Sequence, residues 1–312
     1  DTWKSRGLGD VYKRQSGTEA LTAVYGFQID LSTSFTGEDS LDISIDAGNA
    51  GAEGVAEFDL NSTADKLTVD GVSYSFPVGD KTSVIVGAQG TDGSAIFTTA
   101  CTYGGPSNTL DDCGNVSSAF GSMSGSSVGV SYAVTDEFSI AAGYAGNGTD
   151  SAKGLMTSEG LDATGFNAAY STDTYGLSVT YASVETALAK PAGSYADSSI
   201  ALNGYFSPEG FPSISAGYEF IDVGGAGVNV DEKTAFFVGL QFDEVGPGSA
   251  GVAVGTQGSI TEGSDEALMY EAYYSYPVND GMTITPLVYA KEATSSTDED
   301  ETGIMVKTSF SF

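Results

Sequence analysis

Apolar and polar residues alternate with a period of two along most of the chain, which is the pattern of strands with one apolar and one polar face. From residue 20 onward this pattern fills segments of about eight to eleven residues, separated by clusters of Gly, Asp, Ser and Pro. The Asp70–Gly71 break predicts a bulge or an early turn inside one segment. We expect sixteen strands, near 21–31, 40–47, 53–60, 66–77, 82–90, 127–134, 138–146, 164–171, 175–184, 198–207, 213–222, 233–243, 250–258, 267–277, 282–291 and 303–312.

The links between these strands alternate in length. Short links at 78–81, 135–137, 172–174, 208–212 and 278–281 interleave with long polar links at 91–126, 147–163, 185–197, 223–232, 259–266 and 292–302. Short turns at one end and long loops at the other are typical of transmembrane barrels. The fold predicted is therefore all-β: an antiparallel up-and-down transmembrane β-barrel of about 16 strands, with short periplasmic turns and long extracellular loops. The first predicted strand and the last would place both termini in the periplasm.

The alternation also predicts which side chains face the interior. In the strand over 40–47, Leu41, Ile43 and Ile45 alternate with polar or acidic residues. A charge facing the middle of a bilayer costs roughly 2–4 kcal/mol for Lys and less for an acid, so strand acids are expected to face inward. A soluble sandwich would alternate in the same way with its faces exchanged. The predicted interior charges are Asp30, Asp42, Asp46, Glu57, Asp59, Glu219, Glu271 and Lys307.

Composition excludes several functions. The chain has 42 Asp and Glu against 11 Lys and Arg, no His, and a net charge of −31. That charge repels nucleic acid. Without His the commonest general base and the usual zinc ligand are missing, so we predict no enzyme, and the Gly-Ser-Ser-Val-Gly run at 125–129 has no partner for a hydrolase triad. No apolar run approaches the ~20 residues of a membrane-spanning helix.

The first residues differ from the rest. The first fifteen hold both Arg and the only Trp and show no alternation. They lack the apolar stretch of a secretory signal. We expect residues 1–19 to be a non-native or disordered segment and residues 20–312 to form the barrel.

Aromatic residues mark the short turns. A related phrase recurs over 74–80, 132–136 and 274–280, with aromatics in the last strand residues followed by a tight bend, and Pro in two of the three. Aromatic girdles lie at membrane interfaces, although tyrosines also end strands in soluble β proteins. The chain ends Thr-Ser-Phe-Ser-Phe, with Phe310 and Phe312 in alternate positions.

Together these features resemble the cyanobacterial porins of the carbohydrate-selective porin superfamily, often called iron-uptake porins. The resemblance covers about 20–312. It implies a homotrimer in the lipid bilayer of the cell outer membrane, assembled by machinery that recognises Phe310 and Phe312. It also implies a water-filled channel, without a cofactor, for passive diffusion of small hydrophilic solutes and inorganic ions, iron or sugars among them. Members usually carry a signal peptide, an S-layer-homology domain and a helical segment before the barrel; we expect this chain to be a barrel fragment.

The longest link, 91–126, is the third long loop, and in general porins that loop folds inward and narrows the pore. Cys101 and Cys113 lie in it, and their spacing suits a disulfide formed in the oxidising periplasm. Two free thiols, or metal ligation, are the alternatives. The acids of this loop are expected to line the constriction. They are Asp92, Asp111 and Asp112.

Interior carboxylates attract cations, so a cation-preferring pore is expected. Acid runs at 262–266 and 298–301 lie in long loops, where such runs are usually only solvated; weakly bound calcium or magnesium is the alternative. The competing hypothesis for the whole chain is a soluble β-rich surface-layer or adhesive protein.

Overall fold

A computed structural model gives the fold of the chain. It describes residues 4–5, 8–14, 21–49, 62–91, 93–114, 125–146, 154–157, 162–185, 198–222, 232–261, 264, 266–294 and 300–311. Among these residues, no helix has the length and apolar character needed to span a bilayer.

In the described ranges, nearly all of the regular structure is strand. Two short 3-10 turns, η2 (Gly93–Ile96) and η3 (Asp111–Cys113), lie between β6 and β7. The strands are β1 (Lys4–Ser5), β2 (Leu8–Arg14), β3 (Leu21–Thr33), β4 (Ser40–Gly48), β5 (Thr68–Val78), β6 (Thr82–Thr91), β7 (Gly125–Ala133), β8 (Phe138–Gly146), β9 (Asp162–Ser171), β10 (Tyr175–Glu185), β11 (Ser198–Phe206), β12 (Ser213–Asp222), β13 (Glu232–Val245), β14 (Gly248–Thr256), β15 (Ile260–Thr261), β16 (Leu268–Asn279), β17 (Met282–Lys291) and β18 (Glu301–Ser311).

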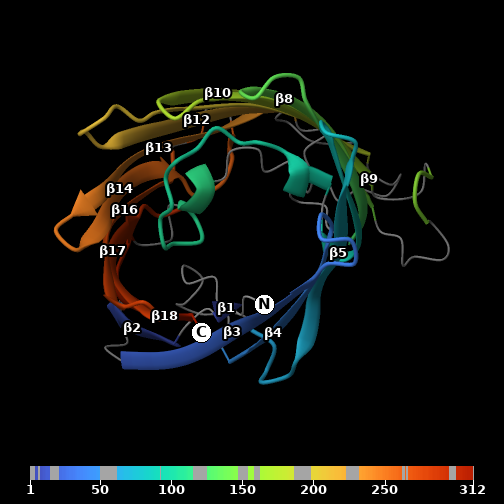
Figure 1. Cartoon of the computed structure of the whole chain (residues 1–312). Helices are drawn as coiled ribbons and strands as arrows, with labels where there is room; N and C mark the ends of the chain where they lie inside the picture. Colours follow the sequence, from blue (N-terminus) through green and yellow to red (C-terminus); the bar gives the residue numbers. More distant parts are fainter. Residues whose placement is uncertain are drawn as a thin grey trace.

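Each strand pairs antiparallel with its neighbours in an up-and-down order, and the strands form a ring (Figure 1). The last strand, β18, pairs with β2, and β2 pairs with β3, so the hydrogen-bonded ladder runs around the whole ring. β1 and β2 share one position beside β18, and the two-residue β15 pairs with β13 next to the end of β14. Sixteen strand positions result, as predicted.

The predicted position of one strand was wrong. β4 pairs directly with β5, so the sheet has no place between them for the strand predicted over 53–60, a range outside the described residues. β1 and β2 fill the sixteenth position instead. β3 consequently runs toward the short-turn end, opposite to the direction predicted. The side-chain pattern failed here because β2 is held by backbone pairing with β3 and β18. The predicted non-native status of residues 1–19 stays a prediction.

The other predicted strands all overlap observed ones, and the bulge is confirmed. The register between β4 and β5 shifts between Ser44 and Ile45, whose partners Gly71 and Val69 leave Asp70 unmatched. The short turns all lie at one end of the ring and the long loops at the other.

The two faces of the ring differ in the sense opposite to a soluble protein. In β10, Leu177 and Val179 are 64% and 41% exposed, whereas Ser178 and Thr180 are buried. β12 repeats this alternation from Ser213 to Phe220. The buried face is the inner one, because the segment inside the ring bonds to it, as described below. The barrel therefore presents apolar residues outward and polar residues inward.

Candidate functional site: the loop on the inner wall of the barrel

The segment between β6 and β7 lies within the ring of strands (Figure 1). Its backbone bonds to polar side chains of successive strands. The Thr98 amide donates to Asn167 Oδ1 of β9 at 3.0 Å, and Asn167 Nδ2 donates back to the Thr98 carbonyl at 3.1 Å. The Ala100 amide donates to Ser178 Oγ of β10 at 2.9 Å. The inner polar positions thus satisfy backbone groups of a segment that has no sheet partner of its own.

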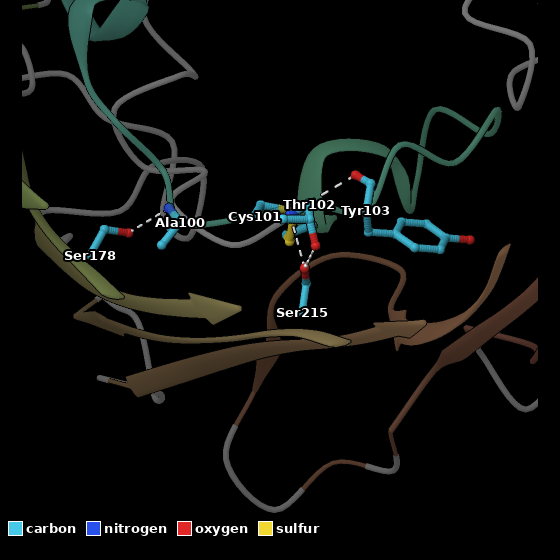
Figure 2. Close-up of a disulfide and its surroundings, with 7 residues drawn as sticks. Ala100, Cys101, Thr102, Tyr103, Ser178 and Ser215 are labelled. Atoms are coloured by element: carbon cyan, nitrogen blue, oxygen red, sulfur yellow. Dashed lines mark hydrogen bonds between the residues drawn. A yellow bond between two sulfur atoms is a disulfide. The ribbon is translucent and has the colours of Figure 1, made fainter. Parts of the chain in front are cut away.

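The segment continues across β12 in the same way. The Thr102 amide donates to Ser215 Oγ at 2.9 Å, and the two hydroxyls of Thr102 and Ser215 lie 2.9 Å apart (Figure 2). The loop therefore follows the circumference of the inner wall and does not cross the middle of the barrel between these anchors.

Glycines let the start of the loop approach the wall. η2 contacts β6, β7, β8 and β9. A Cβ added at Gly129 or Gly143 would come within 2.6 or 2.5 Å of the Gly93 carbonyl oxygen, respectively. Gly129 and Gly143 are cross-strand partners, so they form one flat patch on β7 and β8. A side chain on either would push η2 into the interior.

Cys101 and Cys113 are joined by a disulfide, with their Cα atoms 6.1 Å apart. Before Gly114, Asp112 and Cys113 both adopt positive φ, 44° and 69°, which turns the chain back at η3. The disulfide closes a compact loop of 102–112 against the wall, with Cys113 itself buried. Such a cross-link restricts the conformations open to the segment between the two sulfurs.

Tyr103 is more deeply buried than Phe97, the other aromatic residue in the described part of the loop. It is 2% exposed, and its hydroxyl donates to Glu271 Oε1 of β16 at 2.5 Å. Its ring lies 5.2 Å from that of Phe237 and 6.0 Å from that of Tyr273. Burial, together with the neighbouring Glu271 carboxylate, raises the pKa of Tyr103 well above its usual range, so this hydroxyl keeps the proton it donates.

An apolar cluster forms around Tyr103 on one side of the interior. Leu110 and Cys113 of the loop pack with residues of β13 to β18 there. The wall members are Phe237, Ala253, Met269, Tyr273, Leu287, Tyr289 and Met305. The loop is thus fixed to this half of the barrel by a small hydrophobic core as well as by hydrogen bonds.

The opposite wall is acidic. β4 lies eight of the sixteen strand positions from β12 in either direction around the ring, when β1 is counted with β2 and β15 with β14. Asp30 of β3 accepts hydrogen bonds from Gln28 Nε2 at 2.7 Å and from Ser44 Oγ of β4 at 2.8 Å. Asp42 accepts one from Ser40 Oγ at 2.8 Å. With the buried Asp46, these carboxylates line the inner face of β3 and β4, across the interior from the loop.

The remaining predicted site residues are dispersed. Glu219 and Glu271 are buried on the inner face. Lys307 is half-buried and lies on the same face, because its cross-strand neighbour is the buried Thr285. In the loop, Asp111 is half-buried and Asp112 exposed. Phe310 is exposed on the outer face. Glu57, Asp59, Asp92 and Phe312 lie outside the described residues.

Two acids of the run at 298–301 accept hydrogen bonds. Asp300 accepts one from the Ala293 amide at 3.0 Å, and Glu301 accepts one from the Tyr289 hydroxyl at 2.7 Å. Within the described part of the chain, no group of three or more His, Cys, Asp or Glu is arranged to hold a metal ion.

The residues that anchor the loop were not predicted from the sequence. Asn167, Ser178 and Ser215 are ordinary alternate polar positions, and only the inward polar pattern could have marked them. Tyr103 carried no signal, because its partner Glu271 is 168 residues away.

Comparison with solved structures shows the fold to be that of porins. A mutant of the Rhodobacter blastica porin aligns over 100% of this chain and 98% of its own, with a TM-score of 0.62 at 16% identity. OprB of Pseudomonas putida (TM-score 0.65, 13% identity, 100% and 94% covered) and a loop-deleted OmpT of Vibrio cholerae (0.65, 11%, 100% and 98%) are also similar. No protein-family model matches the sequence, and no curated protein sequence matches it.

Proposed function

We propose that this chain is an outer-membrane porin, a channel and not an enzyme, through which small hydrophilic solutes and inorganic ions diffuse passively. The observation that carries the proposal is the reversal of the two faces of the sheet. Exposed Leu, Val, Ile and Phe cover the outside, and Ser, Thr, Asn, Asp and Glu line the inside. Lipid is the environment in which that distribution is stable. The likeness to porin structures supports the same function.

The outer surface has the profile expected for a bilayer. Exposed aromatics near the short turns include Tyr132, Tyr170, Tyr175, Phe206 and Tyr276, and those nearer the long loops include Phe166, Tyr181, Phe220 and Tyr270. Aliphatic residues, Val179 and Leu202 among them, lie between the two groups. Two aromatic girdles around an apolar band about 25 Å tall are characteristic of outer-membrane barrels.

The pore is proposed to prefer cations. The described part of the loop contacts β6 to β10, β12, β13 and β16. We therefore propose that the passage runs beside β3 and β4, where Asp30, Asp42 and Asp46 supply negative charge. Lys307 of β18 is the main basic residue proposed for the inner face. Carboxylates at a narrow point favour cations and oppose anions.

Planar-bilayer recording in a KCl gradient tests both claims. We expect stepwise, ohmic conductance and a cation-directed reversal potential. A protein that stays monodisperse without detergent and never inserts would instead favour the soluble surface-protein alternative.

The triple variant Asp30→Asn, Asp42→Asn, Asp46→Asn should move the reversal potential toward zero, because it removes three charges from the passage. The matched control Asp80→Asn, Asp136→Asn, Asp173→Asn removes three exposed charges from the short turns. An equal shift in both variants would contradict a filter on β3 and β4.

By resemblance we further propose a homotrimer, assembled through recognition of the terminal strand with Phe310 and Phe312, and a cyanobacterial iron-uptake role. Chemical cross-linking of the detergent-solubilised protein tests the trimer. Conductance with iron salts in place of KCl tests the solute.

A further inference from the structure

Among the described contacts of the loop, its tip bonds to the wall differently from its start. Thr98, Ala100 and Thr102 bond to uncharged side chains through their backbone. Tyr103 reaches β16 with its side chain and bonds to a carboxylate. A hydrogen bond to a charged acceptor is stronger than one between neutral groups, and burial excludes the water that would compete for it.

Two glycines make room for this contact. A Cβ at Gly239 of β13 would approach Tyr103 Cδ2 to 2.7 Å, and one at Gly105 would collide with Glu271 Oε1. The Tyr103 ring therefore contacts β13 at Gly239, and the chain at Gly105 passes directly beside the carboxylate. Gly105 of the loop and Gly239 of the wall together determine the position of Tyr103.

We propose that Tyr103 and Glu271 form a latch that holds the tip of the loop, residues 103–113, against the wall and so keeps the passage beside β3 and β4 open. This inference rests on the proposed channel function and names positioning residues for it. When the latch opens, the Cys101–Cys113 disulfide keeps the tip compact, and Ser215 still holds Thr102. The tip then leaves the wall but stays in the lumen, where it blocks current intermittently.

Tyr103→Phe removes the hydroxyl and keeps the ring, so it tests the latch with little change in packing. Losing one hydrogen bond to a charged group shifts the docked-to-released equilibrium about 10- to 100-fold. In single-channel recordings we expect brief closures to become more frequent by a factor of that order. Glu271→Gln keeps an acceptor without the charge and should give a smaller effect in the same direction.

Tyr273→Phe is the matched control. Tyr273 is buried in the same cluster, but its hydroxyl donates to Gln241 Oε1 of β13, at 2.5 Å, and not to the loop. If both hydroxyls had only a structural role, the two variants would lose the same stability and would close no more often than wild type. The latch is overturned if Tyr103→Phe closes no more often than Tyr273→Phe.

Hydrogen exchange of the detergent-solubilised protein provides a readout that needs no current. Amides of 103–113 should exchange faster in Tyr103→Phe than in wild type or Tyr273→Phe, and unchanged exchange would overturn the latch. If wild type shows this protected tip but never conducts, the proposed channel function fails while the latch stands.

Discussion

At the residue scale, one carboxylate organises the link between β3 and β4. Asp39 Oδ1 accepts from Ser34 Oγ at 2.6 Å and from the Thr36 amide at 2.7 Å, and Oδ2 accepts from Tyr74 Oη of β5 at 2.6 Å. The Ser34 hydroxyl, then that of Tyr74, and the Thr36 amide hold the pKa of Asp39 far below its usual range. The ionised side chain thus ties a six-residue link to the neighbouring hairpin.

Asp39→Ala should lower the unfolding temperature in detergent near neutral pH. Because its pKa is depressed in the folded state, ionised Asp39 stabilises fully above the unfolded value of about 3.9. Below that pH the unfolded chain takes up a proton that the folded chain does not, and the stabilisation fades. The difference from wild type should therefore be constant from pH 5 to 8 and shrink below about pH 4. Thermal unfolding followed by circular dichroism measures it.

The control for this prediction is Asp80→Ala, in the exposed turn between β5 and β6. An effect of the same size and pH profile there would mean that any turn acid contributes in this way.

At the element scale, tyrosines on the inner face lie across glycines of the adjacent strand. Tyr289 of β17 is paired with Gly303 of β18, and a Cβ at Gly303 would collide with the Tyr289 ring. Tyr273 and Gly251 form the same arrangement between β16 and β14. Glycine thus allows a large inner side chain to lie flat on the wall, which leaves the lumen clear.

Gly303→Ala should destabilise the barrel by about 1–3 kcal/mol, because the added methyl displaces Tyr289 from the wall. The displacement should also break the bond from Tyr289 to Glu301. Urea unfolding in detergent measures the change. Gly104→Ala, where a Cβ would meet open space, should be nearly neutral, and equal losses in both variants would contradict the packing argument.

The elements that the sequence predicted are those whose side chains alternate. β12 was recognised because its outward residues from Ile214 to Phe220 are apolar, and the break at Asp70 marked the bulge in β5. β2 was missed because backbone pairing, and not alternation, places Leu8–Arg14 between β3 and β18. The inward position of the acids of β3 and β4 was predicted from the same alternation. The contacts that Tyr103 and Ser215 make could not be predicted, because contacts between a loop and a wall leave no periodic pattern in the sequence.

At the scale of the whole molecule, the outer face decides where the protein is stable. Val179 lies in the middle of β10 on that face, between Tyr175 and Tyr181, and all three are exposed. In the proposed membrane this position contacts lipid tails. A soluble protein of the same fold would leave it in water.

Val179→Lys should weaken folding into lipid vesicles by about 2–4 kcal/mol, the cost of Lys near the bilayer midplane. Thr174→Lys, in the exposed turn at the end of the same hairpin, should fold like wild type. Urea titration in vesicles, read from the heat-dependent mobility of the folded band, measures both. Equal folding of the two variants would contradict a lipid-facing β10.

The hydrogen bonds that dock the loop span long stretches of chain. The loop residue and its partner on the wall are 69 positions apart for Asn167, 78 for Ser178, 113 for Ser215 and 168 for Glu271. Contacts of such sequence separation form late, after the strands that carry the partners are in place. The barrel must therefore assemble around an undocked loop, and the last contact, to β16, needs the greatest share of the chain. The lumen acquires its final width only at the end of folding, so a nascent barrel encloses a different space from the mature one.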